Sequence, residues 1–471
     1  MKTALRDFRL AGLVLGLAIL AGCKIGPDYE RPALSEPASF RRAPTDTNTA
    51  DASISAAALP FSALFPDPQL NAYIDEALTN NFDIKIAAAR VLQAEAAARV
   101  TRSQLFPTIA AGGDWTTSRT SQRGPSAGAP DPQVEFGSAF VAMPSYELDL
   151  WGRLRWANDA ARARLFATDA TRHVVRQTLL AQVAAAYFEL LQLDSGLEVS
   201  RQLLSSGSKS MDLTMERQQH GVAAMQDVRQ AEVLVRTAEA SIIDFQRRIQ
   251  LKENELCLLL GRNPGSLHRG PALTEQVVPA SIPAGLPSEL LSNRPDIRSA
   301  EELLIASHAD VGQAKAAFFP QLTLTGSYGF QSVALSDLFT APARTWQFGP
   351  ALSAPLFTGG RLRGNLKLAQ AQFEEAVAAY QKTVQTAFRE VSDALVDYQR
   401  LREFTAKQLE LTEVYRDVMR LANLRYEQGV TSYLEVLYNQ QKLFEEELNL
   451  TQAQLNQLTT VVRLYRALGG G

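Results

Sequence analysis

Cysteine and histidine are both scarce in this sequence. Its 471 residues include two cysteines, Cys23 and Cys257, and four histidines. The histidines lie far apart and form none of the Cys/His spacings that typically hold a metal ion. At most one disulfide could form. The sequence therefore gives no support to a metal centre, to a bound cofactor or to a fold stapled by disulfides.

An excess of basic charge is missing too. Lysine and arginine number 47 and aspartate and glutamate 50, which gives a net charge of −3 without a dense basic patch. Nucleic acid is therefore not expected as a partner. Beyond the first residues, no segment has the roughly 18 consecutive apolar residues of a transmembrane helix. If the chain crosses a membrane, it must do so with strands.

The first residues have the pattern of a secretory signal peptide. A basic head precedes a short apolar run, and Leu20-Ala21-Gly22-Cys23 follows. These residues resemble a bacterial lipoprotein box, which implies that Cys23 becomes the first mature residue and carries a diacylglycerol and an N-acyl chain. Lys24 resembles the residue that sorts lipoproteins to the outer membrane. The alternative is a plain signal peptide with an incidental cysteine. Cys257, among leucines, is expected in the core.

A twelve-residue stretch occurs twice in the chain. Residues 217–228 read RQQHGVAAMQDV and residues 425–436 read RYEQGVTSYLEV, 208 positions apart. Further matches at offsets of 208 and 213 show that the chain is a tandem duplication, with the change of offset in loop-like stretches. The expected organisation is a signal peptide (1–22), a lipid-anchored extended segment (23–66), a first repeat (67–262), a proline-rich linker (263–284) and a second repeat (285–471).

Each repeat has the same expected order of elements. A helix of moderate length ends at Phe-Pro, two strands follow, and two long helices then meet at the repeated turn. The strands alternate apolar and polar residues, which is typical of outer membrane strands; a soluble hairpin with one face on a core is the alternative. The long helices begin near residues 154 and 362, contain no proline, and have a heptad-like spacing that favours near-parallel packing. The expected strands are about 108–118, 136–150, 321–331 and 346–357.

Four strands per chain cannot close a barrel. Bacterial barrels need at least about eight strands. Open strand edges in lipid would leave backbone groups unpaired, at several kcal/mol each. The chain is therefore expected to share a barrel with copies of itself. Two chains would supply eight strands and three would supply twelve, and the strand count alone does not choose between them.

Several stretches together resemble the outer membrane efflux proteins, the TolC and OprM family, over nearly the whole mature chain. They are the lipoprotein box followed by Gly26-Pro27-Asp28-Tyr29, the stretch ELDLWGR at 147–153, the stretch LFTGGR at 356–361, and the repeated turn. The resemblance implies a mainly α protein with membrane β-strands. It would be a homotrimer in which a twelve-stranded β-barrel is continuous with a twelve-helix periplasmic α-barrel.

The resemblance also implies a location and partners. The chain would sit in the outer membrane, anchored by lipid, and extend into the periplasm. It would passively conduct drugs or other small toxic compounds delivered by a periplasmic adaptor (membrane fusion) protein and an inner-membrane pump of the resistance-nodulation-division class. A duct for type I protein secretion or metal-ion efflux is one alternative, and a lipid-tethered periplasmic coiled-coil scaffold is another. No convergent set of catalytic residues is found, so an enzyme is not expected.

The repeated turn is the candidate functional site. In each repeat it is expected to form the periplasmic tip of a helical hairpin, where a glycine supplies the left-handed conformation that ends a helix. Three chains with two tips each would present six similar tips to the adaptor. The residues expected to dock are Arg217, Gly221, Val222, Arg425, Gly429 and Val430.

The resemblance further implies a periplasmic gate at these tips. Its residues would be Asp227, Tyr426, Leu434, Glu435 and Tyr438. Asp227 and Tyr426 match a latch between helices. Leu434 matches an apolar constriction, and Glu435 matches an acidic ring. Tyr438 and Thr431 stand where the family has an acidic residue and an arginine. Closure is therefore expected to depend less on charge and more on apolar and hydrogen-bond contacts.

Two carboxylates near the end of a predicted strand form a second candidate site. Glu147 and Asp149 share one face of the strand, opposite Leu148 and Leu150. The polar face is expected to line the lumen, where the two charges would favour cations. A surface charge pair is the alternative.

Overall fold

The computed structural model describes residues 24–34, 59–119, 121, 123, 133–279, 282–283 and 287–470. Cys23, the expected lipidation site, lies outside the described residues. Two compact units make up the chain. Unit 1 comprises Met1–Ala33, Val91–Thr168 and Ala300–Tyr380, and unit 2 comprises Leu34–Arg90, Asp169–Ser299 and Gln381–Gly471. Each unit takes segments from both sequence repeats.

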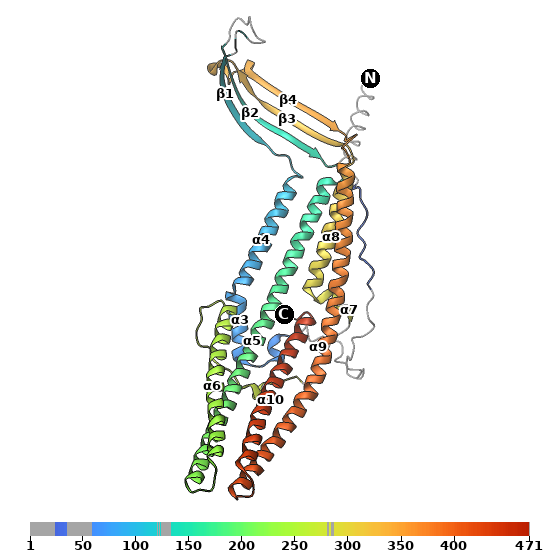
Figure 1. The fold of residues 1–471 in the computed structure, drawn as a ribbon. Coiled ribbons are helices and arrows are strands. Elements are labelled where there is room, and N and C mark those ends of the chain that lie inside the picture. The colour runs from blue at the N-terminus through green and yellow to red at the C-terminus, as the bar shows by residue number, and fades with distance from the viewer. Residues whose placement is uncertain are drawn as a thin grey trace. The chain divides into compact units, whose positions relative to one another are not determined.

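Unit 1 contains a four-stranded antiparallel sheet (Figure 1). Its strands are β1 (Ala110–Arg119), β2 (Gln133–Leu148), β3 (Gln321–Ser332) and β4 (Arg344–Ser353), paired in that order. Pairing of β2 with β3, from Gly137↔Ser332 to Leu148↔Leu322, joins the two sequence repeats in one sheet. The sequence did not predict this pairing.

Strand β4 ends before the alternating pattern does. The pattern extends to residue 357, whereas the strand stops at Ser353. Ser353 is in register with Gln321, the first residue of β3, so the pairing with β3 ends at Ser353. Beyond it, Leu356 and Phe357 are 96% and 91% exposed. The alternation of apolar residues in the sequence therefore extends beyond the part of β4 that pairs with β3.

The sheet has one apolar and one polar face. Val141, Tyr328 and Trp346 lie in register on neighbouring strands, and all three side chains are exposed. The adjacent row holds Ala142, Ser327 and Gln347, again in register. Because successive residues of a strand point to opposite faces, the two rows lie on opposite sides of the sheet. This confirms the predicted alternation for β3 and β4. In β2 a bulge between Met143 and Tyr146 shifts the register, so Phe140 and Tyr146, which the sequence predicted on one face, lie on opposite faces.

Four long helices repeat as two pairs. Helices α5 (Arg153–Gln219) and α9 (Arg361–Glu427) have 67 residues each, and α6 (Met225–Leu259) and α10 (Tyr433–Ala467) have 35 each. Every boundary of the second pair lies 208 positions after its counterpart in the first. The duplication predicted from the sequence is therefore confirmed at the level of whole elements.

Shorter helices complete the described structure. None of the described helices is both long and apolar enough to cross a membrane. The α-helices are α2 (Phe61–Leu64), α3 (Pro68–Asn80), α4 (Phe82–Ser103), α7 (Pro287–Asn293) and α8 (Pro295–Ala316), and the 3-10 turns are η3 (Leu273–Glu275), η4 (Leu335–Asp337) and η5 (Ala341–Ala343).

Equivalent positions of the two repeats keep equivalent partners in unit 2. The Asn81 side-chain amide donates to the Leu259 carbonyl at the end of α6, over 2.8 Å. In the second repeat Arg294 donates to the Ala467 carbonyl at the end of α10, over 3.1 Å. Arg294 is 7% exposed and also pairs with Glu390. A terminal carbonyl is thus capped in both repeats, by an amide in one and by a guanidinium in the other.

The proline-rich segment between the repeats packs firmly in unit 2 over residues 263–279. Asp67, which is 3% exposed, caps α3 and accepts hydrogen bonds from the Tyr187 hydroxyl and the Gln276 amide, both over 2.9 Å. Cys257 is 1% exposed, and its thiol donates to the Gly265 carbonyl over 3.4 Å. This confirms Cys257 as a core residue.

In unit 1, the segment 24–34 lies against α5 and α8. Lys24 Nζ lies 2.6 Å from a carboxylate oxygen of Asp159 and 3.4 Å from the centre of the Trp156 ring. Trp156 in turn donates from its indole nitrogen to the Ile25 carbonyl over 2.8 Å. The first described residues are therefore held by charge, by a cation–π contact and by a backbone hydrogen bond.

Candidate functional site: the ends of the two helical hairpins

Both hairpin turns belong to unit 2 and share one backbone geometry. Gly221 and Gly429 have φ values of +73° and +72°. Each glycine N–H bonds back to a carbonyl three residues earlier, and the following valine N–H bonds to one five residues earlier. This is the Schellman motif, in which a left-handed glycine ends a helix and satisfies its last carbonyls. The predicted role of the two glycines as helix terminators is confirmed.

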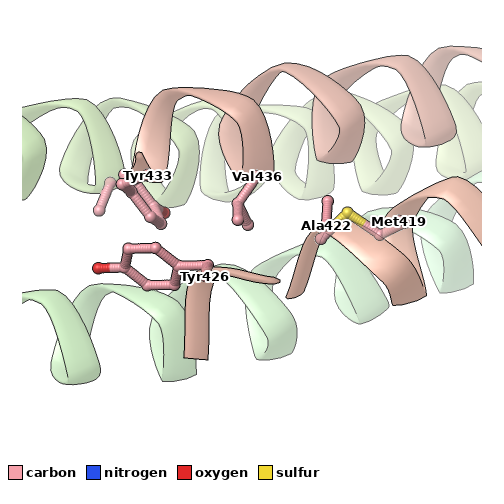
Figure 2. Packing of buried hydrophobic residues seen from close by; sticks show 6 residues of the cluster. Met419, Ala422, Tyr426, Tyr433 and Val436 are labelled. Carbon is pink, nitrogen blue, oxygen red and sulfur yellow. The ribbon is translucent and has the colours of Figure 1, made fainter. Parts of the chain in front are cut away.

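A small apolar cluster lies directly above the turns. It consists of Ala231, Met419, Ala422, Tyr426, Tyr433 and Val436. Figure 2 shows the rings of Tyr426 and Tyr433 lying opposite each other, with centroids 5.5 Å apart. Because Ala231 comes from α6 and the other members from α9 and α10, the cluster ties the first hairpin to the second. Burial of such aromatic side chains stabilises the packing of the hairpin ends.

Tyr433 was not singled out by the sequence analysis. It is 2% exposed, and burial together with the neighbouring Tyr426 raises its pKa to about 12. Its phenol therefore stays neutral at physiological pH, so Tyr433 contributes packing rather than charge. The first repeat has Met225 at the equivalent position, and that side chain is 55% exposed. The positions of Tyr433 and Met225 differ in burial, which a single sequence does not report.

Tyr426 is held by the first hairpin. Its hydroxyl lies 3.4 Å from the Thr214 hydroxyl on α5. The Arg217 guanidinium carbon lies 4.3 Å from the centre of the Tyr426 ring, a cation–π arrangement. Arg217 also donates to the carbonyls of Tyr426 and Glu427 over 3.0 and 3.1 Å. The last residues of α9 are therefore capped by a side chain of α5.

Asp227 has a local partner in the described structure. Its carboxylate accepts a hydrogen bond from the Ala224 N–H over 3.2 Å, at the start of α6. No hydrogen bond among the described residues joins Asp227 to Tyr426. Within one chain, then, Asp227 caps its own helix, where the dipole favours a negative charge. The latch role suggested by the family resemblance stays a prediction.

Glu435 occupies the equivalent place at the start of α10 but has different partners. Its carboxylate pairs with Arg425 over 2.9 Å and accepts a hydrogen bond from the Thr431 hydroxyl. All three residues belong to the second hairpin. Thr431, the position where the family resemblance leads one to expect an arginine, is thus a hydrogen-bond donor to the acid. The acidic ring role of Glu435 stays a prediction.

The tips carry several exposed apolar side chains among polar ones. Val222 and Val430, the residues after the two glycines, are 75% and 65% exposed. Leu434 and Tyr438, on the first turns of α10, are 57% and 60% exposed. Exposed apolar side chains gathered at one end of a helical hairpin are a common feature of protein contact surfaces. Their placement agrees with docking and constriction roles, which remain predictions.

The two carboxylates near the end of β2, in unit 1, are paired with arginines. Glu147 accepts from Arg153 Nε over 2.9 Å, and Asp149 accepts from the Arg155 backbone N–H over 2.9 Å and its Nε over 3.3 Å. Glu147 is in register with Thr323, so it lies on the polar face of the sheet. Each carboxylate is thus charge-balanced and anchors the first turn of α5. Lining of a lumen by this pair stays a prediction.

A family model matches most of the chain. The model described as "Outer membrane efflux protein" matches residues 73–262 and 286–470. These two matches correspond to the two sequence repeats.

Among the described residues, no group of three or more His, Cys, Asp or Glu side chains is placed to hold a metal ion.

Curated relatives match the chain from end to end. The solvent efflux pump outer membrane protein SrpC of Pseudomonas putida is 38% identical over 462 residues, which cover 97% of this chain and 97% of the relative. Outer membrane protein OprJ of Pseudomonas aeruginosa is 36% identical over 473 residues, covering 98% and 96%.

Solved structures match the fold. The open state of the outer membrane channel MtrE of Neisseria gonorrhoeae aligns with a TM-score of 0.85 and 31% identity, covering 95% of this chain and 98% of that one. A membrane protein from Pseudomonas aeruginosa aligns with a TM-score of 0.85 and 35% identity, covering 95% and 98%.

Proposed function

The chain belongs to the outer membrane efflux protein family, and we propose that it works as a lipid-anchored homotrimer forming one duct. Family membership supports a location in the outer membrane, since the relatives are named as outer membrane proteins, one of them of a solvent efflux pump, and a solved relative as an outer membrane channel. In this proposal the chain is the channel of a tripartite efflux system, with an adaptor and an inner-membrane pump. It passes drugs or other small toxic compounds that a pump of the resistance-nodulation-division class delivers. The chain itself has no catalytic role, since a duct only conducts what a pump drives.

The amphipathic four-stranded sheet is the observation that best supports this proposal. Its apolar face carries exposed aromatic residues, with Trp346 73% and Phe348 63% exposed. Strands β1 and β4 each pair on one side only among the described residues. In lipid, unpaired strand edges are costly and apolar faces are favoured. Three copies of the sheet, joined edge to edge, give twelve strands and satisfy both demands.

The kind of compound is suggested by the relatives. Several of them are named for the efflux of solvent, of toluene and of antibiotics. Small apolar or amphipathic toxic compounds are therefore the proposed cargo. A duct of this kind imposes little selection, so the proposed choice of cargo is made at the pump.

Lipid attachment at Cys23 is the remaining part of the proposal. The Lys24 side chain contacts Trp156 and Asp159, so the residue after Cys23 has a defined position in unit 1. A lipid on Cys23 then adds about 0.8 kcal/mol of membrane affinity for each buried CH₂. Labelling with a radioactive fatty acid is expected in the full-length protein and not in the Cys23→Ser variant. Equal labelling in both would contradict attachment at Cys23.

Two measurements test the duct itself. Native mass spectrometry of the detergent-extracted protein is expected to give three chains per particle, and a stable folded monomer would contradict the shared barrel. In a host lacking its own efflux ducts, co-expression with the cognate adaptor and pump is expected to lower the intracellular level of an apolar dye. Omission of this chain is the control, and no difference between the two would reject the efflux role.

A further inference from the structure

Arg217 and Arg425 occupy the same position in the two repeats but bind different hairpins. Each lies four residues before the glycine of its turn. Arg425 pairs with Glu435 of its own hairpin over 2.9 Å. Arg217 instead crosses to the second hairpin, where it bonds to two carbonyls and stacks on the Tyr426 ring. The same residue type at the same backbone position therefore makes an ion pair within one hairpin in one repeat, and two hydrogen bonds between hairpins in the other.

The neighbouring residues explain the difference. Asp227 stands where the second repeat has Glu435, and its shorter side chain is engaged by the Ala224 N–H. Ala223 stands where the second repeat has Thr431, so the hydroxyl that helps to orient Glu435 is missing from the first repeat. Without an acid of its own hairpin to bind, Arg217 is available to the carbonyls at the end of α9.

Those carbonyls are suited to a guanidinium. The last carbonyls of a helix lack intrahelical partners and carry the negative end of the helix dipole. Arg217 is half-buried against the Tyr426 ring, whereas Arg425 is exposed. Partial removal from water strengthens a charge-assisted hydrogen bond, which favours the bonds of Arg217 to these carbonyls.

We propose that Arg217 is a positioning residue for the gate: it pins the end of α9 to α5 and thereby fixes where α10 begins. Helix α10 begins at Tyr433, and its first turns carry Leu434 and Tyr438, the exposed residues predicted to narrow the duct. Release of Arg217 frees the second hairpin to swing independently of the first. This inference rests on the proposed function, because it gives a structural tie a role in opening the duct.

Single-channel conductance in a planar bilayer tests the proposal, with Arg217→Ala as the variant and Arg420→Ala as the matched control. Both changes remove one arginine near a hairpin end, but Arg420 is exposed and pairs with Asp417 of its own helix. One charge-assisted hydrogen bond is worth about a tenfold change in an equilibrium constant. Arg217→Ala is therefore expected to raise the ratio of open to closed channel about tenfold, and Arg420→Ala to leave it within about twofold of the parent.

Two further variants separate positioning from simple loss of stability. Arg217→Lys keeps the charge and one donor but loses the planar stacking, so an intermediate open ratio is expected. Tyr426→Leu keeps apolar bulk without an aromatic face and is expected to open the channel even where Arg217→Ala fails to assemble. All variants are first checked as trimers by native mass.

The outcomes are distinguishable. A wild-type protein that forms no channel overturns the proposed function. A wild-type channel whose open ratio is unchanged in Arg217→Ala, Arg217→Lys and Tyr426→Leu overturns the positioning role of Arg217 alone. An equal rise in Arg217→Ala and Arg420→Ala overturns it as well, because then any arginine lost near a tip opens the duct.

Discussion

The glycines that end the four long helices share one backbone conformation but not one environment. Gly221, Gly261, Gly429 and Gly469 all have φ between +72° and +91°. A Cβ added at Gly221 or Gly429 would meet no atom within 4 Å. At Gly261 and Gly469 it would lie 2.6 and 2.7 Å from the carbonyl oxygens of Asn80 and Asn293. At the two tips, glycine is therefore favoured by the backbone conformation alone. At Gly261 and Gly469 the lack of space for a Cβ atom favours it as well.

Alanine at these positions is expected to separate the two effects. Gly429→Ala should cost about 1–2 kcal/mol, the strain of a left-handed non-glycine residue. Gly469→Ala should cost clearly more, because backbone atoms within 3 Å of the new methyl must also move. Thermal unfolding of the two purified variants beside the parent measures the difference. Equal losses of stability would contradict the steric argument.

At the residue scale, the sequence identified the important positions better than their partners. The glycines, the exposed valines and Tyr426 all lie where the repeated turn placed them. The partners depend on side-chain length and burial: Asp227 caps α6, while Arg217 reaches the other hairpin. A repeat pattern reports which positions correspond, and it does not report whether an arginine binds an acid of its own hairpin or the carbonyls of the other.

Among the elements, the described N-terminal segment behaves as a strap over a buried histidine. His308 of α8 is 6% exposed and lies in edge contact with Tyr29 of the strap, Trp156 of α5 and Phe373 of α9. Burial, and then the nearby Lys24 and Lys315, lower the pKa of His308, while Asp28 acts in the opposite direction. The imidazole is therefore held neutral by the packing of four elements.

Acid is expected to weaken this packing. A histidine with a folded pKa below its unfolded value of about 6.5 contributes stability above that pH and loses it as the pH falls. The melting temperature should therefore drop more between pH 7.5 and about 5 in the parent than in His308→Phe, which keeps the aromatic contacts without a titrating group. His173→Gln, at an exposed position, is the control and should follow the parent. An identical drop in all three proteins would rule out His308.

The local sequence predicted which segments are helices and which are strands. It did not predict the residue at which each element ends. The absence of proline and the repeated turn predicted the long helices, and the structure has them with equal lengths in both repeats. The alternation predicted β4 but continued to residue 357, whereas the pairing stops at Ser353, opposite the first residue of β3. The β2–β3 pairing brings residues from separate repeats together, and local patterns carry no such long-range register.

For the whole molecule, the decisive property is that one chain is incomplete. Its sheet has an apolar face and two edge strands among the described residues, so the strand count alone required further copies. Counting could not choose between two chains and three, because both close a barrel. Family membership supports the proposed choice of three, since the relatives are channels of one architecture.

Charge on the two faces of β4 tests this view. Gln347 and Phe348 are neighbours on opposite faces in the middle of β4, and both are exposed. Arginine at a lipid-facing position near the bilayer centre costs about 2–4 kcal/mol, and less at a polar face. Phe348→Arg is therefore expected to lower the yield of trimer in purified outer membranes, and Gln347→Arg to leave it near the parent level. The reverse ranking would mean that the apolar face is not the lipid face.

The equal lengths of the duplicated helices have a consequence for how such a chain can change. Because the two turns share one backbone geometry at a fixed offset of 208, each tip is a cassette that fits the other site without insertion or deletion. Side chains in one cassette can therefore diverge while the other retains its chemistry. A single gene thereby holds two corresponding ends whose side chains can differ wherever the contacts between the two hairpins allow it. Residues 217–227 and 425–435 already differ in this way. Arg425 pairs with Glu435 of its own hairpin, whereas Arg217 donates to a carbonyl of the other hairpin.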